Sequence, residues 1–174
     1  MKTLLLMRHA KSSWRDGDLA DHERTLNARG ARAAPWMGKW LQERGIAPDQ
    51  LVTSTAVRAV ETAKAVALEL GYSGSLLLAP GLYLAAVRNH IEVISSLEAD
   101  PASVLIVGHN PGISETASAL SGIELDMPTA ALAWIELDID HFSELQKTTR
   151  GRLVQFQRPP QEEKGSKSSK KGNS

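Results

Sequence analysis

Arginine and histidine side chains follow three short apolar segments of the sequence, at the point where each segment ends. The first segment leads to Arg8 and His9, the second to Arg58 and the third to His109. In an open parallel sheet, side chains just beyond the carboxyl ends of neighbouring strands share one crevice. We therefore expect the four side chains to meet. Two guanidinium groups and two imidazoles would form an anion-binding centre that contains a nucleophile.

The segment Gly-His-Asn-Pro-Gly at 108–112 is the most specific of these motifs. It puts an imidazole between a strand end and a helix start, where free N–H groups and the helix dipole favour negative charge. A tight turn would explain the glycines and the proline but not His109. Arg58 opposes the dipole at the start of its own helix at a cost of about 0.3–1 kcal/mol, which an adjacent anion would offset. The pair Arg8-His9 alone fits a strand-capping histidine equally well.

The rest of the sequence predicts the elements that hold these residues. Apolar runs predict strands, and apolar residues at helical spacing predict helices. Asn27 is a candidate helix cap, and Pro35 predicts a local kink in the helix that follows. The expected strands are 2–7, 50–53, 76–78, 103–107, 130–137 and 153–156, and the expected helices are 27–45, 55–70, 89–97 and 111–120.

Strands and helices alternate up to residue 120, which predicts parallel pairing with right-handed crossovers. The fold class is therefore α/β, a three-layer α/β/α sandwich with a mostly parallel central sheet. The last two strands are expected to be antiparallel. The 174 residues suit a single domain, which we assign to 1–157.

Charge and composition limit the remaining possibilities. Residues 158–174 carry five basic and two acidic side chains, a net charge of +3, and almost nothing apolar, which predicts a disordered basic tail. We expect this tail to be solvated rather than bound to nucleic acid. The sequence has no cysteine, no signal-peptide core and no apolar run of about 18 residues, so we expect a cytoplasmic protein with no membrane partner.

Several motifs in order resemble the histidine phosphatase superfamily, specifically the small SixA-like phosphohistidine phosphatases. The resemblance spans residues 2 to about 157 and implies a phosphoglycerate-mutase-like fold. It departs at Ala10, where most members have glycine, and we expect a methyl group to be tolerated there if φ is negative. The motifs are Arg8-His9, Arg24-x-Leu26 with Gly30, the stretch from Ser54 to Thr62, Leu82-Tyr83, and Val107 to Gly112.

The resemblance implies that His9 is the nucleophile and forms a covalent phosphohistidine. Arg8, Arg58 and His109 would clamp the phosphoryl oxygens, and no cofactor or metal is implied. His9 must be neutral to attack, whereas His109 helps more as a cation. The two imidazoles therefore predict a bell-shaped pH profile.

Two further residues of the Asp-x-x-Arg pattern are candidates. The resemblance implies that Arg24 supports the phosphate pocket and that Asp21 donates a proton or orients water. An ion pair between Asp21 and Arg24 on a surface loop is an equally good interpretation of the carboxylate.

The substrate is predicted from what the sequence lacks. Residues 81–86 have no carboxylate where mutase-like relatives place a glutamate, and the imidazole that leaves phosphohistidine needs less acid assistance than an alkoxide. Residues 63–103 leave no room for a lid insertion. Both features favour a histidine-phosphorylated protein, such as a phosphotransfer domain, over a small metabolite. The sequence predicts no oligomeric state.

Other interpretations remain open. A small-molecule phosphomonoesterase of the phosphoglycerate-mutase-like type would use the same His9, and a non-catalytic phosphate-binding module would use it only as a ligand. An aspartyl-phosphate phosphatase built on Asp138 and Asp140 is disfavoured because residues 141–174 are too few for its core. The other histidines are interpreted as surface or loop residues, and Trp14 is a candidate wall of the pocket. These histidines are His22, His90 and His141.

Overall fold

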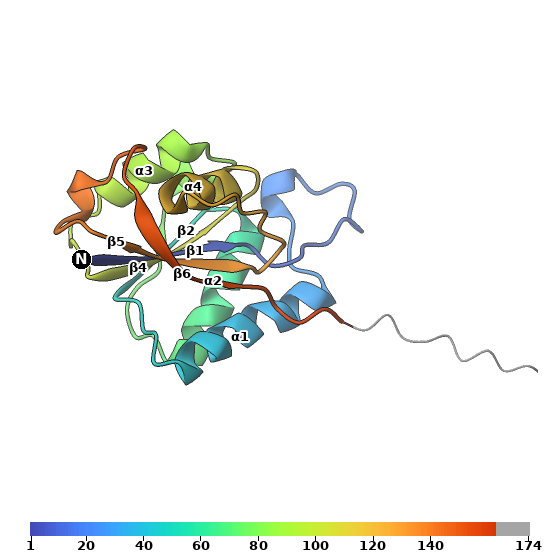
Figure 1. Cartoon of the computed structure of the whole chain (residues 1–174). Coiled ribbons are helices and arrows are strands. Elements are labelled where there is room, and N and C mark those ends of the chain that lie inside the picture. The colour runs from blue at the N-terminus through green and yellow to red at the C-terminus, as the bar shows by residue number, and fades with distance from the viewer. Residues whose placement is uncertain (163–174) are drawn as a thin grey trace, which may run out of the picture.

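A six-stranded mixed sheet forms the centre of the computed structural model, which describes residues 1–162 (Figure 1). The strand order is β3-β2-β4-β1-β5-β6, in which β3, β2, β4 and β1 are parallel and β5 and β6 are antiparallel to their neighbours. The predicted α/β class with its mostly parallel sheet is confirmed. The strands are β1 (Lys2–Arg8), β2 (Gln50–Thr53), β3 (Leu77–Leu78), β4 (Ser103–Gly108), β5 (Leu132–Leu137) and β6 (Gly151–Gln157).

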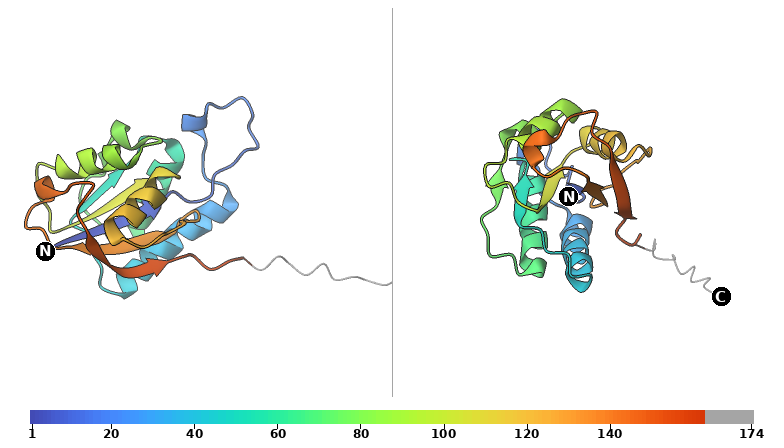
Figure 2. Two further views of the ribbon diagram at one scale, coloured as in Figure 1. Left: turned by 45° about the horizontal axis from the view of Figure 1, so that its top comes forward. Right: turned by 60° about the vertical axis from the view of Figure 1, so that its left-hand side comes forward.

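Helices cover both faces of the sheet, as the three-layer prediction requires (Figures 1 and 2). Helices α1 (Ala28–Glu43) and α2 (Val57–Leu70) pack on one face, and α3 (Val87–Ser95) and α4 (Gly112–Ser121) on the other. Helix α1 continues through Pro35. No helix in the described part of the chain is long and apolar enough to cross a membrane.

The core explains why β1 is an unbroken apolar run. Leu4 and Leu6 enter the hydrophobic cluster on the α3/α4 side, and Leu5 and Met7 enter the cluster on the α1/α2 side, all with 0% exposure. A strand that is buried on both faces has no solvent-exposed side, so its residues do not alternate between apolar and polar. Each such side chain contributes about 1.5–3 kcal/mol on burial, so the strand is held firmly between β4 and β5. The residues that follow it are positioned accordingly.

Helix α1 begins where the sequence predicts. The Asn27 side chain accepts a hydrogen bond from the Gly30 backbone at 2.9 Å, which satisfies one free N–H of the first turn. Gly30 itself lies against the backbone of Lys11, and a Cβ there would overlap the Lys11 carbonyl oxygen. The glycine therefore allows the loop after β1 to pack on the first turn of α1.

The described residues beyond β6 run back toward α1. Residues 158–162 have no regular secondary structure, and Glu162 Oε1 accepts a hydrogen bond from Arg32 Nε at 2.7 Å. The remainder of the predicted tail, residues 163–174, lies outside the described residues.

Candidate active site

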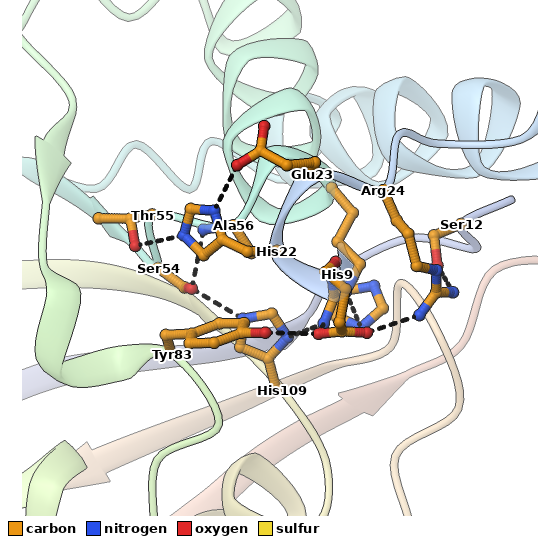
Figure 3. Close-up of polar contacts among 12 residues, drawn as sticks. His9, Ser12, His22, Glu23, Arg24, Ser54, Thr55, Ala56, Tyr83 and His109 are labelled. Carbon is orange, nitrogen blue, oxygen red and sulfur yellow. Dashed lines mark hydrogen bonds and ion pairs between the residues drawn. The ribbon is translucent and has the colours of Figure 1, made fainter. Parts of the chain in front are cut away.

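The three predicted junctions converge at one edge of the sheet. β1, β4 and β2 are adjacent and parallel, so their carboxyl ends bring His9, His109 and Arg58 together. Arg58 Nε lies 3.4 Å from His9 Nε2, and Arg58 Nη2 lies 3.3 Å from His109 Nδ1. The centroids of the two imidazole rings are 5.1 Å apart (Figure 3). All three side chains are buried, with 8%, 2% and 3% exposure, respectively.

The contacts of His9 determine its tautomer. His9 Nδ1 is 2.7 Å from the carbonyl oxygen of Ala10. Because a carbonyl oxygen only accepts, Nδ1 must carry the hydrogen, and Nε2 keeps a lone pair. That lone pair faces Arg58 across a long contact of 3.4 Å, which is a weak hydrogen bond. His9 is therefore held with an unprotonated nitrogen directed into the cationic pocket.

The surroundings of His9 favour its neutral form. Burial, with smaller contributions from the positive charges of Arg58, Arg8 and Arg24, lowers the pKa of His9 to about 4, and the Ala10 hydrogen bond opposes this shift. The imidazole is thus neutral at pH 7. A neutral imidazole with a free lone pair is the form that attacks phosphorus.

His109 is also neutral in the resting site, which differs from the cation that the sequence predicts. Arg58 donates to Nδ1, so Nε2 carries the hydrogen and donates to Ser54 Oγ at 2.7 Å. Burial, followed by the electrostatic effects of His9 and of Arg58, lowers the pKa of His109 to about 3. No sequence pattern indicates the Arg58 guanidinium as a hydrogen-bond donor to this ring.

Arg8 is the last residue of β1 and directly precedes His9. Its Nη1 donates to the carbonyl oxygen of Met127 at 3.0 Å, while its buried Nε has no partner within the described residues. A buried donor without a partner is costly, and an anion beside His9 would satisfy it. Burial lowers the pKa of Arg8, with Asp126 opposing this shift.

Ala10 occupies the position where most members of the resembling family have glycine. Its N–H donates to Thr62 Oγ1 at 3.0 Å, and Thr62 in turn donates to the Arg58 carbonyl oxygen at 2.7 Å. In the described residues, the non-glycine positions with positive φ are Leu84, Asp100 and Ala130. Ala10 is not among them, so its methyl group is tolerated as expected.

Asp21 lies among these cations because a short 3-10 helix, η1 (Asp21–Glu23), turns its carboxylate toward them. Oδ1 accepts from Arg24 Nη1 at 2.9 Å, and Oδ2 accepts from Arg58 Nη2 at 3.0 Å and from the Tyr83 hydroxyl at 2.6 Å. The Tyr83 hydrogen bond, followed by those of Arg58 and Arg24, holds the pKa of Asp21 far below its usual range. The carboxylate is therefore ionised, so in this state it orients or accepts but does not donate a proton.

Arg24 connects the site to the loop after β1. It is 8% exposed, donates from Nε to the Ser13 carbonyl oxygen at 3.0 Å, and also contacts the Ser12 hydroxyl (Figure 3). The predicted ion pair with Asp21 exists, but it is part of the site, because the same carboxylate bridges to Arg58. The ion pair of Asp21 with Arg24 and the position of Asp21 in the site are therefore features of one arrangement.

The sequence indicates Tyr83 and Ser54 only as parts of motifs and predicts no role for either. The Tyr83 ring stands edge-on to His109, with centroids 5.5 Å apart, and its hydroxyl holds Asp21. Its partner Asp21 is 62 positions away in the sequence, and Ser54 is 55 positions from His109. A local sequence pattern cannot indicate contacts between residues that are so far apart in the sequence.

The three histidines that the sequence assigned to the surface differ from one another. His141 is exposed and pairs with Asp100. His22 is half-buried and contacts Thr55 and Tyr83 next to the site (Figure 3). The assignment is wrong for His90, which is fully buried on α3. No group of three or more potential metal ligands occurs within residues 1–162.

The chain belongs to the histidine phosphatase superfamily. Residues 4–82 match the histidine phosphatase superfamily (branch 1). An uncharacterized protein of Mycobacterium tuberculosis (strain ATCC 25618 / H37Rv) is 39% identical over 117 residues, which cover 67% of this chain and 71% of the relative. An uncharacterized chloroplastic protein of Arabidopsis thaliana is 31% identical over 144 residues, which cover 78% of this chain and 66% of the relative. The chain thus spans about two thirds of the length of these relatives.

A solved structure indicates which type of histidine phosphatase this chain resembles. The protein assigned as phosphohistidine phosphatase SixA from Nakamurella multipartitia superimposes with a TM-score of 0.77 and is 28% identical. The superposition covers 91% of this chain and 96% of that protein. The chain is therefore SixA-like in architecture.

Proposed function

We propose that the protein is a phosphohistidine protein phosphatase, a hydrolase that removes phosphate from a histidine-phosphorylated protein such as a phosphotransfer domain. The observation that carries the proposal is the neutral His9, whose Nε2 lone pair is fixed by the hydrogen bond from Nδ1 to Ala10. The proposal includes a role in signal transduction in the cytoplasm, which the cysteine-free sequence supports.

In the first step, the Nε2 lone pair of His9 attacks phosphorus in line with the bond to the leaving group. The P–N bond of the substrate breaks, its electron pair returns to the substrate imidazole, and that imidazole takes up a proton from solvent. Arg8 and Arg58 donate to the phosphoryl oxygens and stabilise their charge as it redistributes, and His109 joins them when its Nδ1 is protonated. His9 then carries the phosphoryl group on Nε2, with Nδ1 still bonded to Ala10.

In the second step, water attacks the phosphoryl group and the P–N bond to His9 breaks. The electron pair returns to His9 Nε2, and the water proton passes to the phosphate product or to solvent. The ionised Asp21 can orient this water, since its carboxylate only accepts hydrogen bonds. The reaction as proposed uses the side chains of this site and no cofactor.

Two features support a protein substrate over a small metabolite. Between α2 and β4 the described chain contains only β3, a 3-10 turn η2 (Pro80–Leu82) and α3, with no inserted lid. Tyr83, rather than a carboxylate, enters the site from this region. A leaving imidazole needs little acid assistance, so such a site suits phosphohistidine.

Parallel assays of a histidine-phosphorylated phosphotransfer domain and of sugar phosphates test the proposal. We expect turnover of the phosphoprotein with the larger kcat/KM and no turnover of either substrate by His9→Asn. His141→Asn is the matched control, because His141 is exposed and contacts Asp100 instead of the site. A larger kcat/KM for sugar phosphates would favour a small-molecule phosphomonoesterase. Phosphate binding without turnover of any substrate would indicate a binding module.

A further inference from the structure

A basic groove lies beside the active site, between the loop after β1 and the first turns of α1. It has a volume of about 510 Å³, and its cationic lining residues are Lys11, Arg15, Arg29 and Arg32, all exposed. An adjoining pocket of about 130 Å³ shares three of these residues, Lys11, Arg29 and Arg32, and is bordered by Glu162. No carboxylate of residues 1–162 lines the larger groove.

The positive charge of the groove does not stabilise helix α1, which carries part of it. Arg29 and Arg32 lie in the first two turns of α1, where the helix dipole disfavours cations. They are also three positions apart, a spacing that brings like charges together on one helix face. Within the described residues, Lys11, Arg15 and Arg29 take part in no ion pair. These three cations therefore remain available to an acidic ligand.

The adjoining pocket already receives one carboxylate. Glu162 Oε1 accepts from Arg32 Nε at 2.7 Å, although the two residues are 130 positions apart in the sequence. A glutamate on an extended segment can thus reach the cations on α1. This contact indicates the kind of ligand that fits.

Trp14 connects the groove to the catalytic residues. Its side chain is 74% exposed, and its ring stacks on the Arg24 guanidinium with 3.3 Å between Cζ and the ring centroid. Arg24 in turn bonds Asp21 inside the site. Exposed tryptophan beside arginine is typical of the residues that dominate protein interfaces. Trp14 therefore belongs to a surface that a partner would cover.

We propose that the groove and Trp14 form a docking surface for an acidic segment of the phosphorylated protein substrate. The segment lies across Arg29 and Arg32, Trp14 packs against it, and the phosphohistidine enters beside Arg24 to reach His9. This inference rests on the proposed function for the identity of the substrate, whereas the binding of the acidic segment is independent of it.

Two phosphohistidine peptides test the docking surface. They share the residues that flank phosphohistidine, and one continues with glutamates where the other has serines. The acidic peptide is expected to have a KM about tenfold lower, with the same kcat. The double variant Arg29→Glu with Arg32→Glu removes this advantage and leaves hydrolysis of para-nitrophenyl phosphate unchanged. The variant folds, because acidic side chains suit the first turns of a helix.

The matched control is Lys147→Glu with Arg150→Glu, which makes the same change in charge on exposed residues near the turn η3 (Phe142–Glu144). It retains the preference for the acidic peptide. Equal KM values for the two peptides with the wild-type protein, or an equal loss in both double variants, would overturn the docking surface.

Direct binding separates this inference from the proposed function. The acidic peptide without phosphate is titrated while tryptophan fluorescence is recorded, and its Kd is expected to rise about tenfold in the Arg29/Arg32 variant and on raising salt from about 0.05 M to about 0.5 M. If this occurs while neither phosphohistidine peptide is hydrolysed, the docking surface stands and the proposed function fails. Tighter binding of a single-stranded oligonucleotide than of the acidic peptide would overturn the docking surface.

Discussion

Arg58 is joined to Asp21 at two points: its Nη1 donates to the Asp21 backbone oxygen at 2.6 Å and its Nη2 to the carboxylate at 3.0 Å. The same carboxylate takes the Arg24 and Tyr83 donors. A phosphoryl group on His9 would need these N–H groups. In the resting site, the carboxylate of Asp21 therefore competes with phosphate for Arg58.

Replacing the carboxylate with an amide should strengthen anion binding. In Asp21→Asn, the side chain no longer opposes a phosphoryl group with its charge, so we expect vanadate to inhibit at about tenfold lower concentration, equivalent to ~1.4 kcal/mol. Asp18→Asn, on the exposed part of the same loop, is the control and should leave inhibition unchanged. Weaker inhibition in Asp21→Asn would mean that the carboxylate instead holds Arg58 in place for phosphate.

Ser54 positions His109 without touching phosphate. In Ser54→Ala, the N–H of His109 Nε2 loses its acceptor in a buried place, which should cost about 1–3 kcal/mol of stability. We expect kcat to fall about tenfold, or ~1.4 kcal/mol of barrier, because the imidazole can then rotate away from Arg58. Ser54→Thr retains the hydroxyl and should restore the rate. If Ser54→Thr is as slow as Ser54→Ala, the hydroxyl is not what positions the ring.

Acidification should reduce stability over a defined pH window. Burial lowers the pKa of His9 to about 4, from an ordinary value of 6.5 that applies to the unfolded chain. Between these values the unfolded state binds the additional proton, so stability falls as the pH is lowered from 6.5 and levels off below about 4. The loss attributable to His9 is on the order of 3 kcal/mol. Urea unfolding between these pH values should show a smaller loss for His9→Asn, and equal losses would contradict the lowered pKa.

The same pKa values change the expected rate profile. The bell-shaped profile predicted from the sequence assumed a cationic His109, but the pKa of His109 is about 3 in the resting site. The acid limb of kcat/KM reports the free enzyme, so it should inflect near pH 4, where His9 becomes protonated. An inflection near pH 6.5 would indicate an unperturbed imidazole.

Gly30 should be intolerant of a side chain, since a Cβ would overlap the Lys11 carbonyl oxygen. We expect Gly30→Ala to destabilise the protein by about 2 kcal/mol or more, which lowers Tm by roughly 4–8 °C in a chain of this size. Gly17→Ala is the control, because nothing lies within 4 Å of its Cβ position. Thermal unfolding of both variants checks the prediction, and an equal Tm would contradict it.

The sequence predicted β1 and β4 to within one residue, because strands buried on both faces are continuous apolar runs. It misplaced the start of α3 by two residues. The sequence predicts Asn89 as the first helical residue, but its side chain accepts a hydrogen bond from the N–H of Ala86, one turn earlier. A helix that begins after alanine offers no capping signal to read.

Within the site, the sequence indicated the residues that follow strands but not those that depend on tertiary contacts. His9, Arg58 and His109 meet because topology alone brings strand ends together. The hydrogen bond from Tyr83 to Asp21 joins two segments that are far apart in the sequence, so no local pattern indicates it. His90 was readable in principle, since it lies four positions before the buried Ile94 on the same face of α3.

The most direct test of this account is to identify the covalent intermediate. The wild-type protein, quenched during turnover of a ³²P-labelled phosphohistidine protein, should carry an acid-labile label that maps to His9. His9→Ala should carry none. An unlabelled wild-type protein under conditions of rapid turnover, or a label that persists in His9→Ala, would contradict nucleophilic attack by this imidazole.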